Sequence, residues 1–467
     1  MSPKLVDELR RAASLLRKAG SVRIVTHIDA DGISAGSIAA LAVQRLGIPH
    51  TLVFEKKITD PVIEGINSCP EDVVWICDLG SAYMSQFTRN GIVVTDHHVP
   101  DGKWRSGQSF LDSFRASYQM NPHLYGLNGS YEVCGAGMTY LLAKEIDPRN
   151  IDLAYLAVVG AVGDFQDTRE SRLVSWNRMI LEDAVSNGDV SVEKGIRYFG
   201  RESRPIAQFL EHGEDPRAEG LSDDRDGCLA LLEGYGIEQF AEDGTRRTWA
   251  DLDASERAVL TDAVSERIPD EADRARLVGE VYTVNRYELH SGLHDVKEFS
   301  TVLNSCGRYD DAETGARLCM GDLSALKDAE RNRRDHRKNI SVALQMVKDN
   351  HLIRRRKYLQ YFDAGTDIRE TVVGIVAGMV LSSDEADPYL PIIAFAAADD
   401  GIKVSARASR PLISKGLDLS QIMKDAAEAV GGLGGGHSVA AGATIPEGTQ
   451  ERFLDEVEKL VSRQISS

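Results

Sequence analysis

The chain has 467 residues, of which 42% are hydrophobic, 27% charged and 6% aromatic. That balance is typical of an ordinary globular protein and excludes long disordered spans, and the length allows two or three domains with cores of their own. The formal net charge of −18 argues against a protein that coats nucleic acid by bulk electrostatic attraction. It does not exclude a nuclease, because divalent cations and local clusters of Arg and Lys can bind phosphate groups inside an acidic shell.

The sequence carries no signal for a membrane or for export. No stretch is long and apolar enough to span a bilayer, and residues 1–18 are charged with a helical period. We therefore expect a cytoplasmic protein that has no membrane partner. Six cysteines are scattered without a CxxC pair, several of them in apolar surroundings, which indicates reduced core residues: Cys69, Cys77, Cys134, Cys228, Cys306 and Cys319.

The first part of the chain alternates strands and helices. An amphipathic helix over residues 3–19 precedes a strand at 22–26, a helix at 34–46, and short apolar strands at 51–54, 73–77 and 92–95. Such alternation predicts a parallel sheet that is covered by helices on both faces. In that architecture ligands gather at the carboxyl ends of the strands.

Acidic and imidazole side chains follow three of these strands, and one more acid follows an apolar helix at 153–162. In chain order they are His27, Asp29 and Asp31, then Asp78, then Asp96, His97 and His98, and finally Asp164. A single Asp at such a position usually forms a turn or caps a helix, and Asp29 would serve as an N-cap. Three strand ends of this kind at one edge of a sheet instead predict a shared site, and oxygen and imidazole ligands suit Mn²⁺ or Mg²⁺.

The middle of the chain is less informative. Residues 198–277 are mostly helical with polar loops and carry no recognisable chemistry, and a strand at 279–284 and a short helix at 297–308 follow. A long helix over 324–347 is nearly all charged in its first half, and a basic run follows at 354–357. One interpretation of this segment is a solvated connector between domains, and the other is a basic surface that contacts the phosphates of a nucleic acid. The two interpretations are compatible.

The last section, residues 357–467, again alternates strands and helices. A period of two along the strand at 403–408 places Lys403, Ser405, Arg407 and Ser409 on one face. That face suits contacts with phosphate or sugar, and a solvent-facing edge strand would have the same pattern.

A glycine cluster lies near the end of the chain. Gly434, Gly435 and Gly436 predict a loop whose N–H groups cradle an anion, with His437 and Arg407 adding charge or donors. The alternative is a tight structural turn between a strand and a helix.

These motifs resemble those of a known family. His27-x-Asp29-x-Asp31, Asp78, Asp96-His97-His98 and Gly163-Asp164 match, in order, the four motifs of the DHH phosphoesterase superfamily, and GGGHSVAAG at 434–442 resembles the GGGHxxAAG motif of the DHHA1 domain. The resemblance implies an α/β fold with an N-terminal parallel-sheet DHH domain (1–188) and a C-terminal mixed α/β DHHA1 domain (357–467). A helical intermediate section (189–323) and a connector helix (324–356) would join them.

The side chains suffice for two divalent cations about 4 Å apart with a shared carboxylate, for which Asp78 is the natural choice. By the resemblance, the first cation would be held by His27 and Asp29, and the second by Asp31, His97 and Asp164. The reaction that such a site supports is hydrolysis of a phosphate ester by an activated water, without a covalent intermediate.

The resemblance also assigns the remaining residues. Asp96 would orient a histidine without binding a cation itself. His98 would not bind the cations either and would contact the scissile phosphate. The residues of the last section would bind the next phosphate or base of the substrate: Ser405, Arg407, Gly434, Gly435, Gly436 and His437.

Within the superfamily, the intermediate section and the passage 297–308 make the chain most similar to archaeal RecJ-like nucleases. This resemblance implies an exonuclease for single-stranded DNA or RNA that uses Mn²⁺, or Mg²⁺ as an alternative, in DNA replication or repair. Two alternatives stay open. One is a replisome scaffold that binds GINS, by resemblance to a eukaryotic replication factor that has lost metal ligands. The other is a phosphodiesterase for cyclic dinucleotides or very short oligonucleotides.

Overall fold

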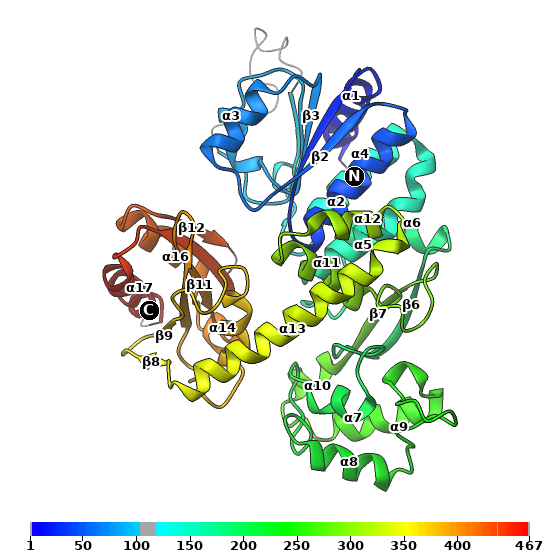
Figure 1. Ribbon diagram of the computed structural model, residues 1–467, viewed down its shortest axis with the longest axis vertical. Coiled ribbons are helices and arrows are strands. Elements are labelled where there is room, and N and C mark those ends of the chain that lie inside the picture. The colour runs from blue at the N-terminus through cyan, green and yellow to red at the C-terminus, as the bar shows by residue number, and fades with distance from the viewer. Residues whose placement is uncertain (1, 103–116, 437, 466–467) are drawn as a thin grey trace. The chain divides into compact units, whose positions relative to one another are not determined.

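A computed structural model describes residues 2–102, 117–436 and 438–465 and divides the chain into two compact units, residues 1–333 and 334–467 (Figure 1). Each unit has a sheet with helices packed on it, so the predicted α/β class with a parallel sheet first and a mixed sheet last is confirmed. Among the described residues, no helix combines the length and the hydropathy that crossing a bilayer requires.

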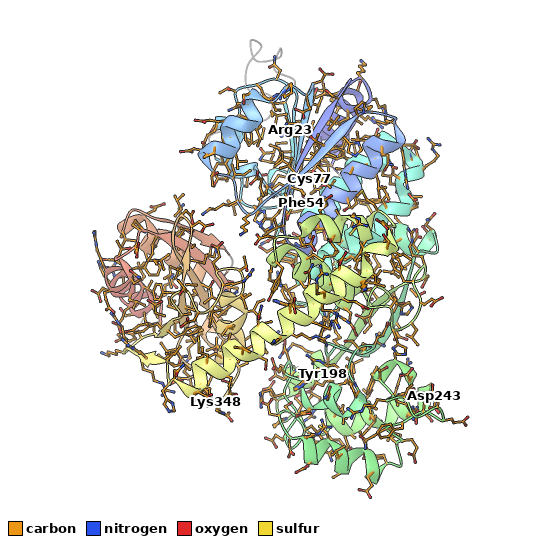
Figure 2. The ribbon with its side chains drawn as sticks, viewed as in Figure 1. Arg23, Phe54, Cys77, Tyr198, Asp243 and Lys348 are labelled. Carbon is orange, nitrogen blue, oxygen red and sulfur yellow. The ribbon has the colours of Figure 1, made fainter. Side chains whose placement is uncertain are left out.

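The first unit is built on a five-stranded sheet in which every pairing is parallel. Its order is β2-β1-β3-β4-β5, with bounds β1 Val22–His27, β2 His50–Glu55, β3 Val73–Cys77, β4 Ile92–Thr95 and β5 Ser117–Met120. Figure 2 labels Arg23, Phe54 and Cys77, which lie on three adjacent strands of this sheet. All five carboxyl ends therefore meet at one edge.

Alternate residues of the central strands face opposite layers of helices. Trp75 and Cys77 of β3 belong to the core that the sheet shares with one group of helices: α1 Pro3–Arg17, α2 Ala30–Arg45, α4 Gly135–Ile146, α5 Ala154–Gly163 and α6 Ser175–Ser186. Val74 and Ile76 face α3, Asp60–Ser68, on the other side. This two-sided burial is the reason why β3 is an uninterrupted apolar run.

The rest of the first unit is a helical insertion on a two-stranded ribbon. β6, Val190–Ile196, pairs antiparallel with β7, Val278–Val284, and the segment between them packs into a core of its own. Its helices are α7 Ile206–Glu211, α8 Arg225–Gly234, α9 Ala254–Ser265 and α10 Glu271–Leu277. Tyr198, labelled in Figure 2, belongs to this core.

After the ribbon the chain returns to the first core. α11, Val296–Arg308, and α12, Ala312–Cys319, contribute Phe299, Leu303 and Leu318 to it. The unit joined by these contacts includes both the expected catalytic section 1–188 and the intermediate section 189–323. The long helix α13, Leu326–Asp349, then runs from the first unit into the second. Short 3-10 helices occur at η1 Ser81–Gln86, η3 Pro122–Tyr125, η4 Pro148–Leu153, η5 Trp249–Asp251 and η6 Leu323–Ala325.

The second unit has a six-stranded sheet of order β12-β13-β11-β10-β9-β8, in which only β9 and β10 are parallel. The strands are β8 Arg354–Arg355, β9 Gln360–Asp363, β10 Ile392–Ala398, β11 Gly401–Arg407, β12 Leu433–Gly436 and β13 Ala440–Ile445. One face packs on α16, Leu419–Ala429, and α17, Gln450–Ile465, and the other on α14, Val373–Leu381. A short helix α15 covers Arg410–Ser414.

Candidate metal centre

The first group of site residues lies where β1 passes into α2. The helix begins at Ala30, four residues earlier than the pattern predicts, so Asp31 lies in its first turn. Asp29 is the N-cap, because its Oδ1 accepts from the Gly32 N–H at 2.9 Å. The simple capping interpretation is therefore true, but it uses one oxygen only. The other, Oδ2, lies 2.9 Å from Nδ1 of His27 and faces the site.

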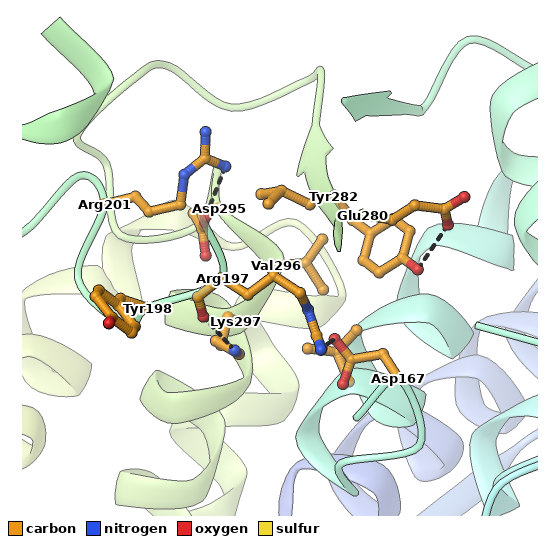
Figure 3. Close-up of a pocket in the computed structure, with 11 residues that line it drawn as sticks. Asp167, Arg197, Tyr198, Arg201, Glu280, Tyr282, Asp295, Val296 and Lys297 are labelled. Atoms are coloured by element: carbon orange, nitrogen blue, oxygen red, sulfur yellow. Dashed lines mark hydrogen bonds and ion pairs between the residues drawn. The ribbon is translucent and has the colours of Figure 1, made fainter. Parts of the chain in front are cut away.

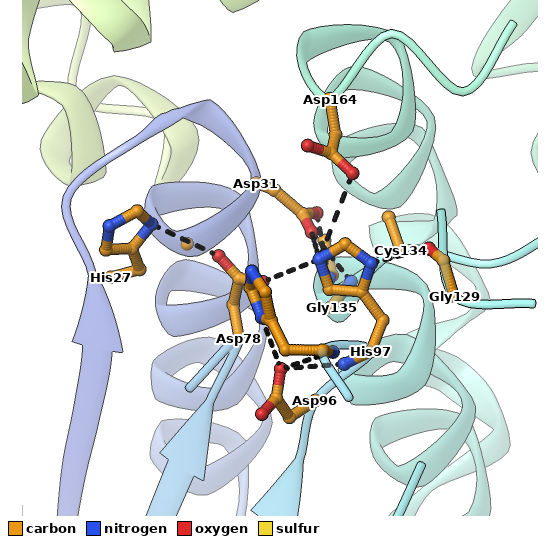
Figure 4. Close-up of polar contacts among 12 residues, drawn as sticks. His27, Asp31, Asp78, Asp96, His97, Gly129, Cys134, Gly135 and Asp164 are labelled. Atoms are coloured by element: carbon orange, nitrogen blue, oxygen red, sulfur yellow. Dashed lines mark hydrogen bonds and ion pairs between the residues drawn. The ribbon is translucent and has the colours of Figure 1, made fainter. Parts of the chain in front are cut away.

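Asp78 lies at the middle of the site, directly after β3. Its backbone is left-handed, with φ of 57°, and its side chain is 1% exposed. Among the described residues neither carboxylate oxygen has a hydrogen-bond partner, while Nδ1 of His27 lies 3.6 Å from Oδ2 and Nε2 of His97 lies 3.2 Å from Oδ1 (Figure 4). Burying an ionised carboxylate without donors is costly. A cation would remove that cost.

Asp96 organises the two histidines that follow it. Its Oδ1 accepts from the His97 N–H at 2.7 Å and lies 2.8 Å from Nδ1 of His98, and its Oδ2 accepts from the Ser81 N–H at 2.8 Å. Burial alone would raise the pKa of Asp96, but His98 and these donors hold it well below its usual range. Asp96 is therefore an ionised anchor behind the site.

His97 points toward the remaining carboxylates. Its Nδ1 lies 2.6 Å from the carbonyl oxygen of Gly129, an arrangement in which Nδ1–H donates and Nε2 faces the site. From Nε2 the distances are 3.7 Å to Oδ2 of Asp31 and 3.8 Å to Oδ2 of Asp164. One imidazole nitrogen thus lies near three acids, Asp78 included.

The helices of the first core hold these two acids. Asp31 accepts from the N–H groups of Gly135 at 2.7 Å and Ala136 at 2.9 Å, at the beginning of α4. Asp164 is the C-cap of α5, where its Oδ2 accepts from Nε2 of Gln166 at 3.0 Å. Both carboxylates keep capacity for a further ligand, since a carboxylate can accept about four bonds.

Together these side chains form what we call the candidate metal centre: His27, Asp29, Asp31, Asp78, His97 and Asp164. Potential ligand atoms lie within 4.8 Å of one another in the groups His27, Asp29 and Asp78, and Asp31, His97 and Asp164. Asp78, His97 and His98 form a third such group. The structure therefore brings together all six residues expected as ligands, with His98 beside them.

The electrostatics of the centre indicate competition between protons and cations. Burial and the neighbouring Asp78 raise the pKa of Asp31, and burial raises the pKa of Asp164 to about 6. Burial would lower the pKa of His27 and of His97, but the surrounding carboxylates more than reverse this and raise both. Four acids and two imidazoles at these distances make a donor set that fits hard divalent cations such as Mn²⁺ or Mg²⁺.

Sequence reasoning missed the residues that position the ligands. Gln166 is buried, and its Nε2 also donates to the Gly129 carbonyl at 2.8 Å while its Oε1 accepts from Nδ2 of Asn177 at 2.6 Å. A Gln two residues after Asp164 was visible in the sequence. Gly129 acts through its backbone, which leaves no side-chain signal, although a Cβ there would clash with the His97 carbonyl.

α11 packs closely on the ligand loop. Oδ1 of Asn304 accepts from the Ala30 N–H at 3.0 Å, and a Cβ on Gly307 would clash with the carbonyl of Ile28. The passage 297–308 thus supports the turn between β1 and α2 from outside.

Two of the residues expected to bind substrate in the second unit lie on the same face of β11, as the period of two predicts. Ser405 and Arg407 face α14, where a Cβ on Gly374 would lie 3.0 Å from Ser405 Oγ and 2.7 Å from Arg407 Nη2. Burial lowers the pKa of Arg407, and among the described residues no carboxylate pairs with it. This face is therefore covered by a helix, and its arginine has charge to offer an anion.

The glycine cluster is a strand and not a loop. Gly434, Gly435 and Gly436 belong to β12, an edge strand that pairs antiparallel with β13. The loop prediction was wrong because the cross-strand partners at 441–443 set the backbone in an extended form, which the glycines alone do not reveal. His437 lies outside the described residues.

The first unit contains a pocket between the ribbon and the beginning of α11 (Figure 3). Its charged groups are mostly paired: Arg197 with Asp167, and Arg201 with Asp295 at 3.8 Å. Nζ of Lys297 donates to the Arg197 carbonyl at 2.8 Å. These contacts tie the helical insertion to the catalytic layers.

Two family models match the chain. The DHHA1 domain matches residues 356–463, and the DHH-CID domain matches residues 198–277, which is the helical insertion. An uncharacterised protein of Methanocaldococcus jannaschii is 27% identical over 483 residues, covering 99% of this chain and 98% of the relative.

Solved structures show the same fold. RecJ from Thermus thermophilus in complex with Mn²⁺ is 18% identical and superposes with a TM-score of 0.59 over 98% of this chain, which spans 55% of that protein's length. CDC45 from Entamoeba histolytica is 12% identical, with a TM-score of 0.61 over 98% of both chains. The chain thus matches the DHHA1 and DHH-CID domain models over parts of its length and shares its fold with RecJ and CDC45.

Proposed function

We propose that this protein is a metal-dependent exonuclease that hydrolyses phosphodiester bonds at the end of single-stranded DNA or RNA. The observation that carries the proposal is Asp78, a buried carboxylate that has no hydrogen-bond partner in the described part of the chain and that belongs to two of the three groups of potential ligands. Phosphoesterases of the DHH superfamily are hydrolases, and the similar Thermus RecJ has been solved with Mn²⁺ and with Mg²⁺.

In the proposed site one cation would be held by His27, Asp29 and Asp78, and a second cation by Asp31, Asp78, His97 and Asp164. When bound, divalent cations supply an activated water near neutral pH and neutralise phosphoryl oxygens. Mn²⁺ and Mg²⁺ both suit a site of carboxylates with few imidazoles.

His98 is the proposed contact to the scissile phosphate. Its side chain is 49% exposed, and Asp96 holds its Nδ1 at 2.8 Å, so Nε2 is available to a substrate. Burial would lower the pKa of His98, but Asp96 more than reverses this and raises it. A protonated Nε2–H can donate to a phosphoryl oxygen as negative charge develops on it.

In the second unit Ser405 and Arg407 are the proposed contacts to a neighbouring phosphate. Arg407 has no carboxylate partner among the described residues, and a guanidinium in that state favours an anion. Gly434, Gly435 and Gly436 offer backbone groups at the sheet edge for the same purpose.

The test is cleavage of an end-labelled single-stranded oligonucleotide with Mn²⁺, with Mg²⁺ and with a chelator. We expect stepwise shortening with either cation and none with the chelator, and faster cleavage of the oligonucleotide than of a dinucleotide or cyclic dinucleotide. Labelled oligonucleotide that stays at full length in Mn²⁺ would contradict nuclease activity. A preference for the dinucleotide would favour a small-molecule phosphodiesterase.

A second candidate function is a replisome scaffold that binds GINS. The similarity to CDC45 over nearly the full length of both chains favours it, whereas the complete set of ligands in the candidate metal centre favours catalysis. Co-purification of GINS subunits with the wild type and with an Asp78→Asn variant would separate the two. Equal recovery of GINS with both would show a scaffold role that does not need the centre, and no recovery would reject it.

A further inference from the structure

Phe165 directly follows Asp164 of the candidate metal centre and ends α5 in a Schellman motif. The Phe165 N–H donates to the Val162 carbonyl at 3.1 Å, and the Gln166 N–H donates to the Ala161 carbonyl at 2.9 Å. In this motif the first residue after the cap must adopt a left-handed backbone, and Phe165 has φ of 57°. The motif therefore fixes the backbone of residues 164–166, from which Asp164 and Gln166 make their side-chain hydrogen bond.

A phenylalanine is an unfavourable residue at this position. Glycine is the usual choice there, since a side chain with a Cβ is strained in the left-handed region and a bulky one is a true outlier. Among the described residues, every other non-glycine residue with positive φ is Asp, Ser or His. Those residues tolerate the conformation better than an aromatic does.

The ring gains nothing from burial that would offset this strain. Phe165 is 69% exposed, whereas Leu156, Val158 and Val159 of the same helix are buried in the core. The local contacts of Phe165 are made by its backbone, whose carbonyl accepts from the N–H of Thr168 at 3.1 Å and from its Oγ1 at 2.7 Å. Folding therefore requires the backbone of residue 165 but not its ring.

Phe165 lies in the chain between a residue of the candidate metal centre and the residue that holds it. Oδ2 of the preceding residue, Asp164, is 3.8 Å from Nε2 of His97, and the following residue, Gln166, holds the same carboxylate at 3.0 Å. A strained, exposed aromatic one residue from a ligand is in position to contact what lies next to the scissile phosphate. In a single strand that neighbour is a nucleobase, which has a free face for stacking.

We propose that Phe165 is the stacking platform for a nucleobase adjacent to the bond that is cleaved. This inference rests on the proposed exonuclease function and extends it to a base subsite. Stacking accepts every base, so it supplies binding without sequence preference, and it requires bases that are not already stacked within a duplex.

The test compares Phe165→Gly with Phe165→Trp. Glycine relieves the backbone strain, so we expect Phe165→Gly to melt at a higher temperature than the wild type. On a single-stranded oligonucleotide we expect its kcat/KM to fall about 5- to 150-fold, the range that loss of one base–aromatic stack produces. Phe165→Trp keeps a stacking surface and should retain most of the activity, and Phe240→Ala, which removes an exposed aromatic of the helical insertion, should retain all of it.

A substrate without the base distinguishes stacking from damage to the centre. With an abasic residue at the end that is cleaved, wild type and Phe165→Gly should have similar rates. Equal cleavage of the normal oligonucleotide by both proteins would overturn the proposal, as would a lower melting temperature of Phe165→Gly or an equal loss on the abasic substrate. If the wild type cleaves no oligonucleotide at all, the proposed exonuclease function fails instead.

Discussion

Asp78 differs from the acids around it because no residue that the structure describes gives it a hydrogen bond. Asp31 has two backbone amides, Asp96 has several donors, and Asp164 has Gln166. The surrounding carboxylates therefore accept hydrogen bonds from the protein, whereas the central carboxylate, Asp78, is left to bind a cation. Removing the charge of Asp78 should therefore weaken cation binding but should not destabilise the metal-free protein.

Asp78→Asn should bind Mn²⁺ less well without destabilising the metal-free protein. Asn tolerates the left-handed backbone, and loss of the charge removes a repulsion that, after burial, is the largest cause of the raised pKa of Asp31. Thermal unfolding should show that Mn²⁺ at 100 times its Kd stabilises the wild type by about 2.7 kcal/mol. The variant should gain much less, and its hydrolysis should fall by more than the roughly 10- to 100-fold that loss of an outer partner costs.

Asp310→Asn is the matched control for this substitution. Asp310 also has a left-handed backbone, with φ of 59°, but it is exposed and pairs with Lys56. Its variant should respond to Mn²⁺ as the wild type does. A metal-free Asp78→Asn protein that unfolds at a clearly lower temperature would show that the carboxylate has a structural partner.

Cation binding should release protons. In the metal-free protein the pKa of Asp164 is about 6, because burial raises it, and the carboxylates raise the pKa of His27 and of His97 despite their burial. A raised pKa keeps the proton on these groups at higher pH, so the cation must displace it. The affinity for Mn²⁺ should therefore rise as the pH increases above 6.

Titration calorimetry in two buffers of different ionisation enthalpy measures this release directly. The number of protons released per cation should be largest below the pKa of Asp164 and should decline as the pH rises through the raised pKa values of Asp164, His27 and His97. A binding heat that is the same in both buffers at every pH would mean that no proton is displaced.

At the scale of the elements, glycines let two helices approach the acids. A Cβ on Gly135 of α4 would lie 2.5 Å from Oδ1 of Asp78, and one on Gly160 of α5 would clash with Oδ1 of Asp31. These contacts are closer than real Cβ atoms make, so the helices can adopt this position only without side chains there. The acids and the helix packing are therefore coupled.

Gly135→Ala should damage the site although Ala is the better helix former. Helix propensity alone favours Ala by about 1 kcal/mol. The new Cβ meets the buried Asp78, however, and we expect both lower thermal stability and weaker Mn²⁺ stabilisation. Gly65→Ala in α3 is the control, because its added Cβ has nothing within 4 Å. That variant should gain about 0.5–1 kcal/mol and keep its Mn²⁺ response.

The apolar pattern made most elements predictable. β3 and β4 were expected at their observed bounds because strands buried on both faces are continuous apolar runs. β5 and β6 were missed for physical reasons. β5, Ser117–Met120, buries the polar Gln119, and β6, Val190–Ile196, is exposed along most of its length. Neither strand therefore has an apolar alternation to detect.

The site was predictable where its chemistry lies in side chains. The six expected ligands converge because they lie at or just after the ends of β1, β3, β4 and α5, and these ends lie together. The amide of Gly135 and the carbonyl of Gly129 hold ligands through the backbone, which no motif of residue types reveals. Likewise, β13 determines that residues 434–436 form a strand, and that pairing partner is a long-range property.

At the scale of the whole molecule, all six residues of the candidate metal centre belong to the first unit. All four tryptophans lie before residue 334 in the sequence, at positions 75, 104, 176 and 249. Trp75 is buried in the core that carries the sheet, and Trp249 in the core of the helical insertion. Tryptophan fluorescence therefore reports the unfolding of residues 1–333, whereas far-ultraviolet circular dichroism reports both units.

Mn²⁺ should separate the unfolding of the two units. In urea, Mn²⁺ should move the fluorescence transition to higher denaturant, by an amount equal to the stabilisation free energy at the Mn²⁺ concentration used, divided by the m-value of the first unit. The part of the circular dichroism change that comes from residues 334–467 should stay where it is, because that unit has its own cores and none of the ligands. Asp78→Asn should abolish the shift and leave the second transition unchanged. If both signals instead move together with Mn²⁺, the units unfold as one, and stabilising the cation ligands would stabilise the DHHA1 sheet as well.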